Sequence, residues 1–211
     1  MIFKQINSGG DRNFSYLIAC GKTRKAAVAD PSPDPGPVLR EIEAFGLSLM
    51  YIFNTHSHSD HIGGNVFLKA RTAAEIVTYS GGGGDIEVND GAFLNTGSIS
   101  YEIFHTPGHT TDSMCILAGD NLLTGDTLFV GKVGGTVTED EAETEFNSLK
   151  KLMSLPGNIS VWPGHNYGTS PSSTISNEKS SNPFILRLDN FREFLWLKQN
   201  WAAYKAEHGI Q

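Results

Sequence analysis

Four residues of types that commonly bind metals fall within six positions of the sequence, in the segment THSHSDHIGGN at residues 55–65. They are His56, His58, Asp60 and His61. Residues two apart in an extended chain project to the same side, so the first two histidines are placed to bind one cation. The aspartate and the third histidine lie past a bend and are offered to a second cation. Imidazole and carboxylate groups suit zinc, iron or manganese. The alternative is a polar turn of solvated or helix-capping histidines, which four ligand-type residues in six positions disfavour.

Three short phrases later in the chain each present one more potential ligand at the end of a predicted strand. The phrases TPGHT, LTGDT and WPGHNY supply His109, Asp126 and His165, respectively. In each phrase a glycine lets the backbone turn sharply after the strand. A lone loop histidine is more often a surface residue, but together these phrases and the first segment contain five of the seven histidines. Of the others, His105 is predicted to lie in the core or to support a ligand, and His208 to be solvated.

The elements that must position these residues are short strands, many of them joined by tight turns. Apolar runs predict strands at residues 2–6, 14–20, 25–30, 49–53, 75–79, 98–105, 113–118, 121–124 and 159–162. Helices are predicted at residues 38–45 and 66–71, from a capping box (TEDE) at 138–141 to about residue 153, and in the aromatic tail from about residue 183. The glycine-rich run at 80–85 is interpreted as a mobile connection, since no helix follows it to bind a phosphate. Short strands joined by hairpins favour two mixed sheets packed face to face with helices outside.

The composition is that of a globular domain rather than of a nucleic-acid-binding or membrane protein. With 211 residues, 39% of them hydrophobic, the chain is expected to form one domain over 1–211, in which residues 169–211 are a helical tail packed on the rest. A net charge of −7 argues against nucleic acid and anionic membrane surfaces as partners. Cys20 and Cys115 lie in apolar runs and are interpreted as reduced core residues. Because the start lacks a signal-peptide pattern and no apolar run is of membrane-spanning length, we expect a soluble, cytoplasmic protein; no feature predicts its oligomeric state.

The motif set HxHxDH, TPGHT, GD and PGH resembles that of the metallo-β-lactamase superfamily, over nearly the whole chain. The resemblance implies an α+β fold, a four-layer αββα sandwich of two mixed sheets with a metal site along one edge. It also implies two divalent metal ions, with zinc favoured and iron or manganese as alternatives. The first ion would be bound by His56, His58 and His109, the second by Asp60, His61 and His165, and Asp126 would bridge them.

Such a site predicts hydrolysis. Metal binding lowers the pKa of water from 15.7 to roughly 7, so a hydroxide between two ions is a nucleophile at neutral pH. The net positive charge of the site would stabilise the oxyanion of a tetrahedral intermediate. Asp60 is predicted to be catalytic, orienting the hydroxide or carrying its proton to the leaving group. The metal site alone leaves an ester, thioester, lactone or amide open as the substrate.

The segment PSSTISNEKSSNPFI at 171–185 is similar to the one that follows the last histidine in glyoxalase II, also called hydroxyacylglutathione hydrolase. This similarity implies a small acyl-thioester substrate such as S-lactoylglutathione. Tyr167 matches a position that contacts glutathione in that family, and Lys132 is loosely matched to another. The tyrosine that the family's longer loop carries has no counterpart in the shorter loop GKVGGT. The basic residues that follow the NPF segment in the family are also missing, with Arg187 and Arg192 as the nearest candidates, so another small thiol remains open as the carrier.

Three other functions stay open at this point. A persulfide dioxygenase of the same fold would use one iron bound by the equivalents of His56, His109 and Asp126, and the same ligand types can serve either metal chemistry. A lactonase is a second enzymatic alternative. A non-catalytic metal-binding module is the third, and the full ligand set makes it the least favoured.

Overall fold

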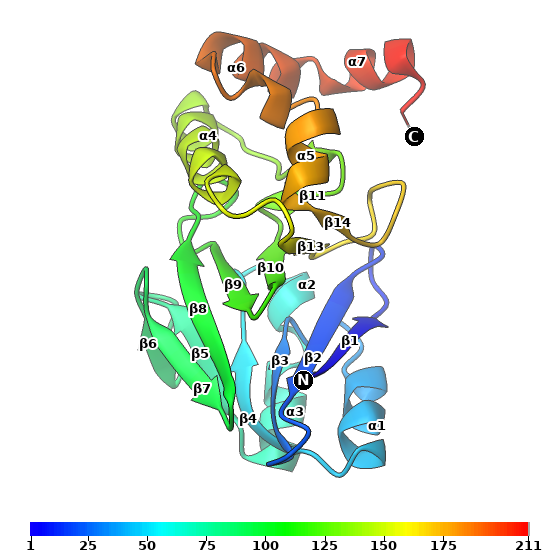
Figure 1. The fold of residues 1–211 in the computed structure, drawn as a ribbon, viewed down its shortest axis with the longest axis vertical. Coiled ribbons are helices and arrows are strands. Elements are labelled where there is room, and N and C mark those ends of the chain that lie inside the picture. The colour runs from blue at the N-terminus through cyan, green and yellow to red at the C-terminus, as the bar shows by residue number, and fades with distance from the viewer. Residues whose placement is uncertain (211) are drawn as a thin grey trace.

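Two six-stranded sheets packed face to face form the centre of the molecule, and helices cover the outer face of each sheet (Figure 1). The computed structural model describes residues 1–210. The strand order is β1-β2-β3-β4-β5-β6 in the first sheet and β14-β13-β10-β9-β8-β7 in the second. Both sheets contain parallel and antiparallel pairs. The α+β four-layer sandwich that the sequence predicts is therefore confirmed.

The first sheet changes from antiparallel to parallel pairing along its order. Its strands are β1 (Ile2–Asn7), β2 (Phe14–Ala19), β3 (Lys25–Ala29), β4 (Ser48–Phe53), β5 (Glu75–Tyr79) and β6 (Ile86–Val88). Hairpin connections join β1 to β2 and β2 to β3, whereas β3, β4, β5 and β6 pair in parallel. The carboxyl ends of β3 and β4 therefore meet at one edge of the sheet, and the histidine-rich segment follows β4 at that edge.

The second sheet brings three strand ends to the same edge of the sandwich. Its strands are β7 (Phe93–Thr96), β8 (Ile99–His105), β9 (Met114–Ala118), β10 (Asn121–Gly125), β13 (Ser160–Pro163) and β14 (Ser173–Thr174). β9 is antiparallel to both β8 and β10, and β13 is parallel to β10. The strands β8, β10 and β13 consequently point the same way, so the residues that follow them lie close together. A two-stranded hairpin, β11 (Leu128–Phe129) with β12 (Lys132–Val133), follows β10.

Three apolar clusters hold the four layers together. Alternate residues of β2 contribute to two of them: Tyr16 faces the core between the sheets, and Leu17 faces the outer layer. The inner cluster includes Phe53 from the first sheet and Tyr101 from the second. The outer clusters pack helices against each sheet, for example Val38 of the first helix against β2 and β3. Burial on both faces explains why β2 reads as a continuous apolar run.

Most helices lie on the outside of the sandwich or in the C-terminal region beyond it, whereas the short helix at Ser59–Ile62 lies at the edge that carries the histidine-rich segment (Figure 1). They are α1 (Gly36–Ala44), α2 (Ser59–Ile62), α3 (Asn65–Thr72), α4 (Glu139–Met153), α5 (Ile175–Ser181), a 3-10 turn at Ile185–Arg187, α6 (Phe191–Gln199) and α7 (Trp201–His208). The predicted capping box of α4 is confirmed, because Thr138 and Glu141 accept hydrogen bonds reciprocally. No helix among residues 1–210 has the length and apolarity needed to cross a bilayer.

The C-terminal tail is not one continuous helical segment, and the glycine-rich run makes defined hydrogen bonds. The tail is interrupted at Asn190, whose side chain caps α6, and at Asn200, while residues 173–174 pair with β13 before any helix begins. Two glycines of the glycine-rich run are hydrogen-bonded to the strand that follows it. The carboxylate of Glu87 accepts hydrogen bonds from the backbone N–H groups of Gly81 (3.2 Å) and Gly83 (3.0 Å).

Candidate metal centre

All seven predicted ligands lie together at the edge where the strand ends of both sheets meet. His56 and His58 follow β4, Asp60 and His61 lie on α2, and His109, Asp126 and His165 follow β8, β10 and β13, respectively. Their donor atoms form three overlapping groups, each with all atoms within 4.8 Å of one another. The groups are His56–His58–His109, Asp60–His61–His165 and His56–His61–Asp126. Residues separated by up to about half the length of the chain thus form one cluster of side chains.

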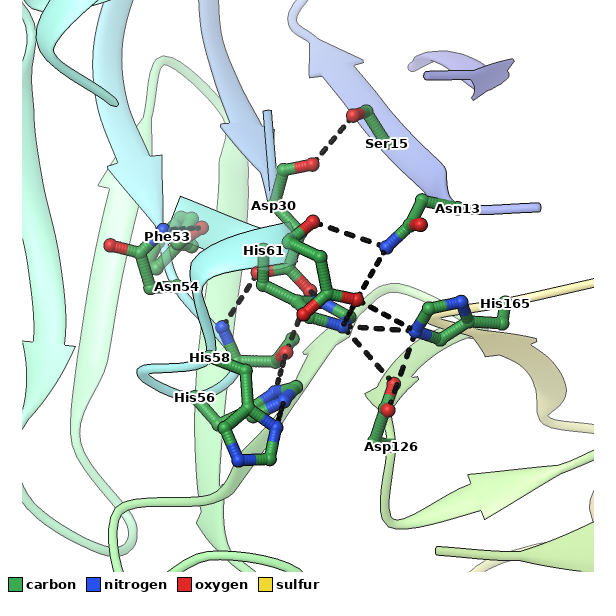
Figure 2. A network of polar contacts seen from close by, with 12 residues as sticks. Asn13, Ser15, Asp30, Phe53, Asn54, His56, His58, His61, Asp126 and His165 are labelled. Atoms are coloured by element: carbon green, nitrogen blue, oxygen red, sulfur yellow. Dashed lines mark hydrogen bonds and ion pairs between the residues drawn. The ribbon is translucent and has the colours of Figure 1, made fainter. Parts of the chain in front are cut away.

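The two predicted ligand triads are adjacent, with Asp126 in contact with both. In the first triad, Nδ1 of His58 lies 3.0 Å from Nε2 of His56 and 3.1 Å from Nε2 of His109. In the second, the Nε2 atoms of His61 and His165 are 3.1 Å apart. Figure 2 shows the Asp126 carboxylate facing these two rings. Its Oδ1 atom lies 3.4 Å from Nε2 of His61, and its Oδ2 atom lies 3.4 Å from Nε2 of His165. Its Oδ2 atom is also 3.7 Å from Nε2 of His109.

Hydrogen bonds on the far side of three rings fix which nitrogen faces the centre. Nδ1 of His61 donates to the Asp30 carboxylate (2.9 Å), Nδ1 of His109 donates to the carbonyl of Gly135 (2.8 Å), and Nδ1 of His165 donates to the carbonyl of Asp11 (2.8 Å). These oxygens only accept hydrogen bonds, so Nδ1 carries the proton. In the neutral ring the Nε2 lone pair then points into the centre, which is the arrangement that metal-binding histidines adopt.

Asp30 organises rings from both triads. It is 2% exposed, and one carboxylate oxygen accepts hydrogen bonds from Nδ1 of His61 and from the hydroxyl of Thr55 (2.6 Å). Since the Thr55 hydroxyl donates to Asp30, it is free to accept from Nδ1 of His56, 3.1 Å away. Asp30 therefore sets the tautomer of His61 directly and that of His56 through Thr55.

The Asp60 side chain also has a buried partner that the sequence did not reveal. Asn13 is 1% exposed, and its Nδ2 atom donates to the Asp60 carboxylate and to the Asp60 carbonyl, both at 3.1 Å. The Asp60 side chain itself is 42% exposed. Its carboxylate is thus held by Asn13 and remains accessible to solvent, which proton exchange requires.

The arrangement fits bound metal ions. Ring nitrogens that face one another about 3 Å apart need a cation between them, either a proton or a metal ion. In addition, the buried Oδ1 atom of Asp126 has no hydrogen-bond partner among the residues that the structure describes. Five imidazoles and two carboxylates are a donor set for divalent zinc, iron or manganese. The chemistry of the seven side chains therefore supports divalent metal binding.

The electrostatics of the centre point the same way. Burial opposes the charged form of His61, but the carboxylates of Asp30, Asp126 and Asp60 raise its pKa to about 9. Burial likewise opposes ionisation of Asp126, yet contact with His165 and the nearby His61 hold the pKa of this carboxyl well below its ordinary value. The ionised carboxylates thus create a negative potential that attracts a cation.

Beside the centre lies a cavity of about 870 Å³ that contains both predicted substrate-binding residues, Lys132 and Tyr167. The Tyr167 ring stacks on that of His165, with ring centroids 4.7 Å apart, and its hydroxyl donates to Asp11 (2.7 Å). The ammonium of Lys132 lies 4.8 Å from the centre of the Tyr167 ring. Arg12 and Lys205 also line this cavity, and no motif in the sequence marks either of them.

Other residues considered at the sequence level lie elsewhere. Arg187 and Arg192 do not line the cavity, and Arg187 instead donates to the carbonyl of Pro183. His105 stacks on Tyr79 with ring centroids 3.7 Å apart, while His208 is exposed at the end of α7. Both cysteines are buried and unpaired, as predicted.

Comparison with known proteins identifies the family. The family model of the metallo-β-lactamase superfamily matches residues 8–84 and 79–165. The chain belongs to the metallo-β-lactamase superfamily. It is 37% identical to the hydroxyacylglutathione hydrolase of Pelagibacter ubique, a match that covers 94% of this chain and 81% of the relative. Three other hydrolases of that name are longer, and the chain spans only 62% to 66% of them.

A second group within this metallo-β-lactamase superfamily is also similar. The human mitochondrial persulfide dioxygenase ETHE1 is 32% identical, over 81% of this chain and 70% of the relative. The crystal structure of ETHE1 from Myxococcus xanthus superposes with a TM-score of 0.88 at 32% identity, covering 95% of this chain and 91% of that one. The chain is thus similar in sequence to relatives named for two different activities.

Proposed function

We propose that the protein is a metal-dependent hydrolase of a small acyl-thioester, similar to glyoxalase II. The observation that carries this proposal is the position of Asp126, in contact with both histidine triads of a seven-residue centre. The metallo-β-lactamase family match and the similarity to hydroxyacylglutathione hydrolases support it. The whole activity is proposed from relatives that are mostly longer than this chain.

In this proposal the two triads bind two divalent ions. His56, His58 and His109 would hold the first, Asp60, His61 and His165 the second, and Asp126 would contact both. Zinc is favoured, with iron or manganese as alternatives. Bound metal would supply a water of lowered pKa and polarise the substrate carbonyl. The contribution of Asp30 and Thr55 is to keep the rings of His61 and His56 in the tautomer that binds.

Asp60 is the proposed proton carrier. Its carboxylate is anchored through Asn13 and lies 3.4 Å from Nε2 of His165, at the solvent-exposed side of the centre. Partial burial opposes ionisation of Asp60, but the hydrogen bond from Asn13 together with the nearby His61 and His165 keeps the pKa of this carboxyl below its ordinary value. The carboxylate is therefore ionised at neutral pH, and can accept a proton from water and pass it to the departing thiolate.

The adjoining cavity is the proposed site of the thiol carrier. Arg12, Lys132 and Lys205 give it three cations, while Asp11 is engaged with the Tyr167 hydroxyl. Partial burial and the charge of Lys205 lower the pKa of Lys132, which indicates an ammonium that lacks enough negative charge around it. A small thiol with carboxylate groups, such as glutathione, would supply that charge.

The cell compartment proposed for this reaction is the cytoplasm. Two buried, unpaired cysteines suit a reducing compartment. The net charge of −7 disfavours nucleic acids and anionic membranes as partners, which leaves a small-molecule thioester as the partner of the cavity.

The second candidate is an iron-dependent persulfide dioxygenase, favoured by the similarity to ETHE1 proteins. It would use His56, His109 and Asp126 for one iron. The close second triad, in which Asp60 approaches His61 and His165, supports the two-metal hydrolase instead. Neither the cavity nor the centre offers a specific reason to prefer a lactonase or a non-catalytic metal-binding module.

One experiment separates these functions. The purified protein is analysed for metal content, then assayed for thiol release from S-lactoylglutathione and for oxygen uptake with glutathione persulfide. We expect two metal ions per chain and thiol release. One iron per chain with oxygen uptake would replace the proposal by the dioxygenase, and bound metal without either reaction would reject both enzymes.

A further inference from the structure

We propose that the buried ion pair between Glu145 of α4 and Lys198 of α6 positions His109, so that the metal centre depends on a helix of the C-terminal region. The inference rests on the proposed role of His109 as a metal ligand. Both members are positioning residues, since neither belongs to a ligand group of the centre. The pair lies outside the cavity proposed for the thiol carrier.

A short chain of contacts connects Lys198 to the His109 ring. The Lys198 ammonium forms an ion pair with the Glu145 carboxylate and donates a hydrogen bond to the carbonyl of Gly134 (2.8 Å). The next carbonyl, that of Gly135, accepts the hydrogen bond from Nδ1 of His109 (2.8 Å). Displacement of the Gly134–Gly135 peptide would therefore release the proton-bearing side of a ring whose Nε2 atom faces His58.

Glu145 also packs against the segment that carries His109. Gly108 has φ +141°, and a Cβ added there would collide with Cα and Cβ of Glu145. A Cβ on Gly134 would lie 2.8 Å from the second carboxylate oxygen of Glu145 and 3.1 Å from Cβ of His109. Helix α4 thus lies directly against both peptides, the one that precedes His109 and the one that orients it.

The burial of this pair argues for positioning rather than for a simple contribution to stability. The Glu145 and Lys198 side chains are 0% and 9% exposed, and Oε1 of Glu145 has no hydrogen-bond partner among residues 1–210. Desolvation costs offset much of the attraction in such buried pairs, and apolar replacements are often as stable. An apolar pair could not donate the hydrogen bond to the carbonyl of Gly134, and this hydrogen bond holds the Gly134–Gly135 segment in place.

The test compares metal binding of the wild type with that of Lys198→Met and of the double variant Glu145→Gln/Lys198→Met. The double variant removes both charges, so it is expected to fold with a near-wild-type thermal midpoint. Lys69→Met, which removes the remote surface pair with Asp85, is the matched control. Each protein is titrated with Co²⁺, and the stepwise affinities and visible spectra are recorded.

We expect both Lys198 variants to bind one Co²⁺ about 10-fold to 100-fold more weakly, with a changed visible spectrum, while the control matches the wild type. For turnover, kcat should fall while KM changes little, because the thiol-carrier cavity is intact. Should Lys198→Met fail to fold, the double variant carries the comparison.

Wild-type Co²⁺ affinities and spectrum in a folded Lys198 variant would overturn the inference. Its failure is distinguishable from that of the proposed function. The wild type's turnover of a thioester tests the function, whereas the difference in Co²⁺ binding between variant and wild type tests the positioning role.

Discussion

The carboxylate of Asp30 accepts a hydrogen bond of 2.9 Å from Nδ1 of His61, a residue 31 positions later in the chain. The same carboxylate binds Thr55, and through it supports His56. One side chain at the end of β3 therefore supports a ring in each triad. Loss of its charge should affect the whole centre.

Asp30→Asn is expected to weaken metal binding without unfolding the protein. The amide keeps the size of the carboxylate but has one accepting oxygen instead of two, so it cannot accept both from the backbone N–H of Thr55 and from Nδ1 of His61. Supporting contacts of this kind typically contribute about 10-fold to 100-fold to metal affinity. Competition with a chromophoric chelator measures the loss, and circular dichroism checks the fold. Unaltered metal affinity would show that Asp30 serves only the backbone around it.

Asp126→Ala is expected to lose at least one metal ion and most of the activity. Its carboxylate is the group in contact with both triads, so its removal leaves the His61 and His165 nitrogens without an intervening negative charge. Elemental analysis of the purified variant gives the stoichiometry. Full metal occupancy with normal turnover would contradict the bridging role.

Lys132→Ala is expected to raise KM for an anionic thioester while leaving kcat nearly unchanged. The ammonium lines the cavity next to Tyr167 and is not among the ligand groups of the centre. Loss of a substrate contact made equally in the ground state and the transition state has this kinetic signature. Lys69→Ala, at a surface ion pair, is the control. Equal KM values for the Lys132 variant and the wild type would remove Lys132 from the substrate site.

Removal of metal by a chelator is expected to lower the thermal midpoint as well as abolish activity. A ligand that binds only the native state stabilises it by about 4 kcal/mol when its free concentration is about 1,000 times Kd. Differential scanning calorimetry with and without added zinc measures the shift. A midpoint that does not respond to metal would contradict binding by the native centre.

The capping box of α4 predicts a pH-dependent contribution to stability. Hydrogen bonds from the backbone N–H groups of Thr138 and Val137 lower the pKa of Glu141 from its ordinary value of 4.5. A depressed folded-state pKa gives stability that is present above the unfolded-state pKa and is lost as the pH falls through the folded-state pKa. Glu141→Ala should therefore be destabilised at about pH 7 and approach the wild type at about pH 3.

Urea unfolding of chelated protein at the two pH values measures this difference without interference from metal. Thr138→Ala removes the other half of the capping box and should cost about 1 kcal/mol of unfolding free energy. A Glu141 variant equally destabilised at both pH values would show that the charge of the carboxylate plays no part.

The motifs place each ligand type directly after a predicted strand, and the resemblance of the motif set to the metallo-β-lactamase superfamily implies that these side chains converge. His56 and Asp126 are recognisable in this way, and so is the Thr138 capping box. Asp30 and Asn13 are not recognisable from the sequence as residues that support the centre. A single carboxylate or amide next to a turn has no periodicity that distinguishes it from an ordinary turn residue. Their roles depend on tertiary contacts with His61 and Asp60.

Other features escaped prediction for related physical reasons. The strands β6, β7 and β14 are edge or near-edge segments of two to four residues, too short for an apolar alternation to be visible. The aromatic residues of the tail have near-helical spacing on both sides of Asn190. Spacing alone therefore does not reveal that the chain breaks there and that the Asn190 side chain caps the next helix, α6. No local pattern marks Lys198, because its buried partner Glu145 lies 53 residues away in the sequence.

The strand ends that supply the centre belong to both sheets, and the last of them, β13, leads to His165. The ligand set is therefore incomplete in a nascent chain until His165 has been added and the two sheets have packed against each other.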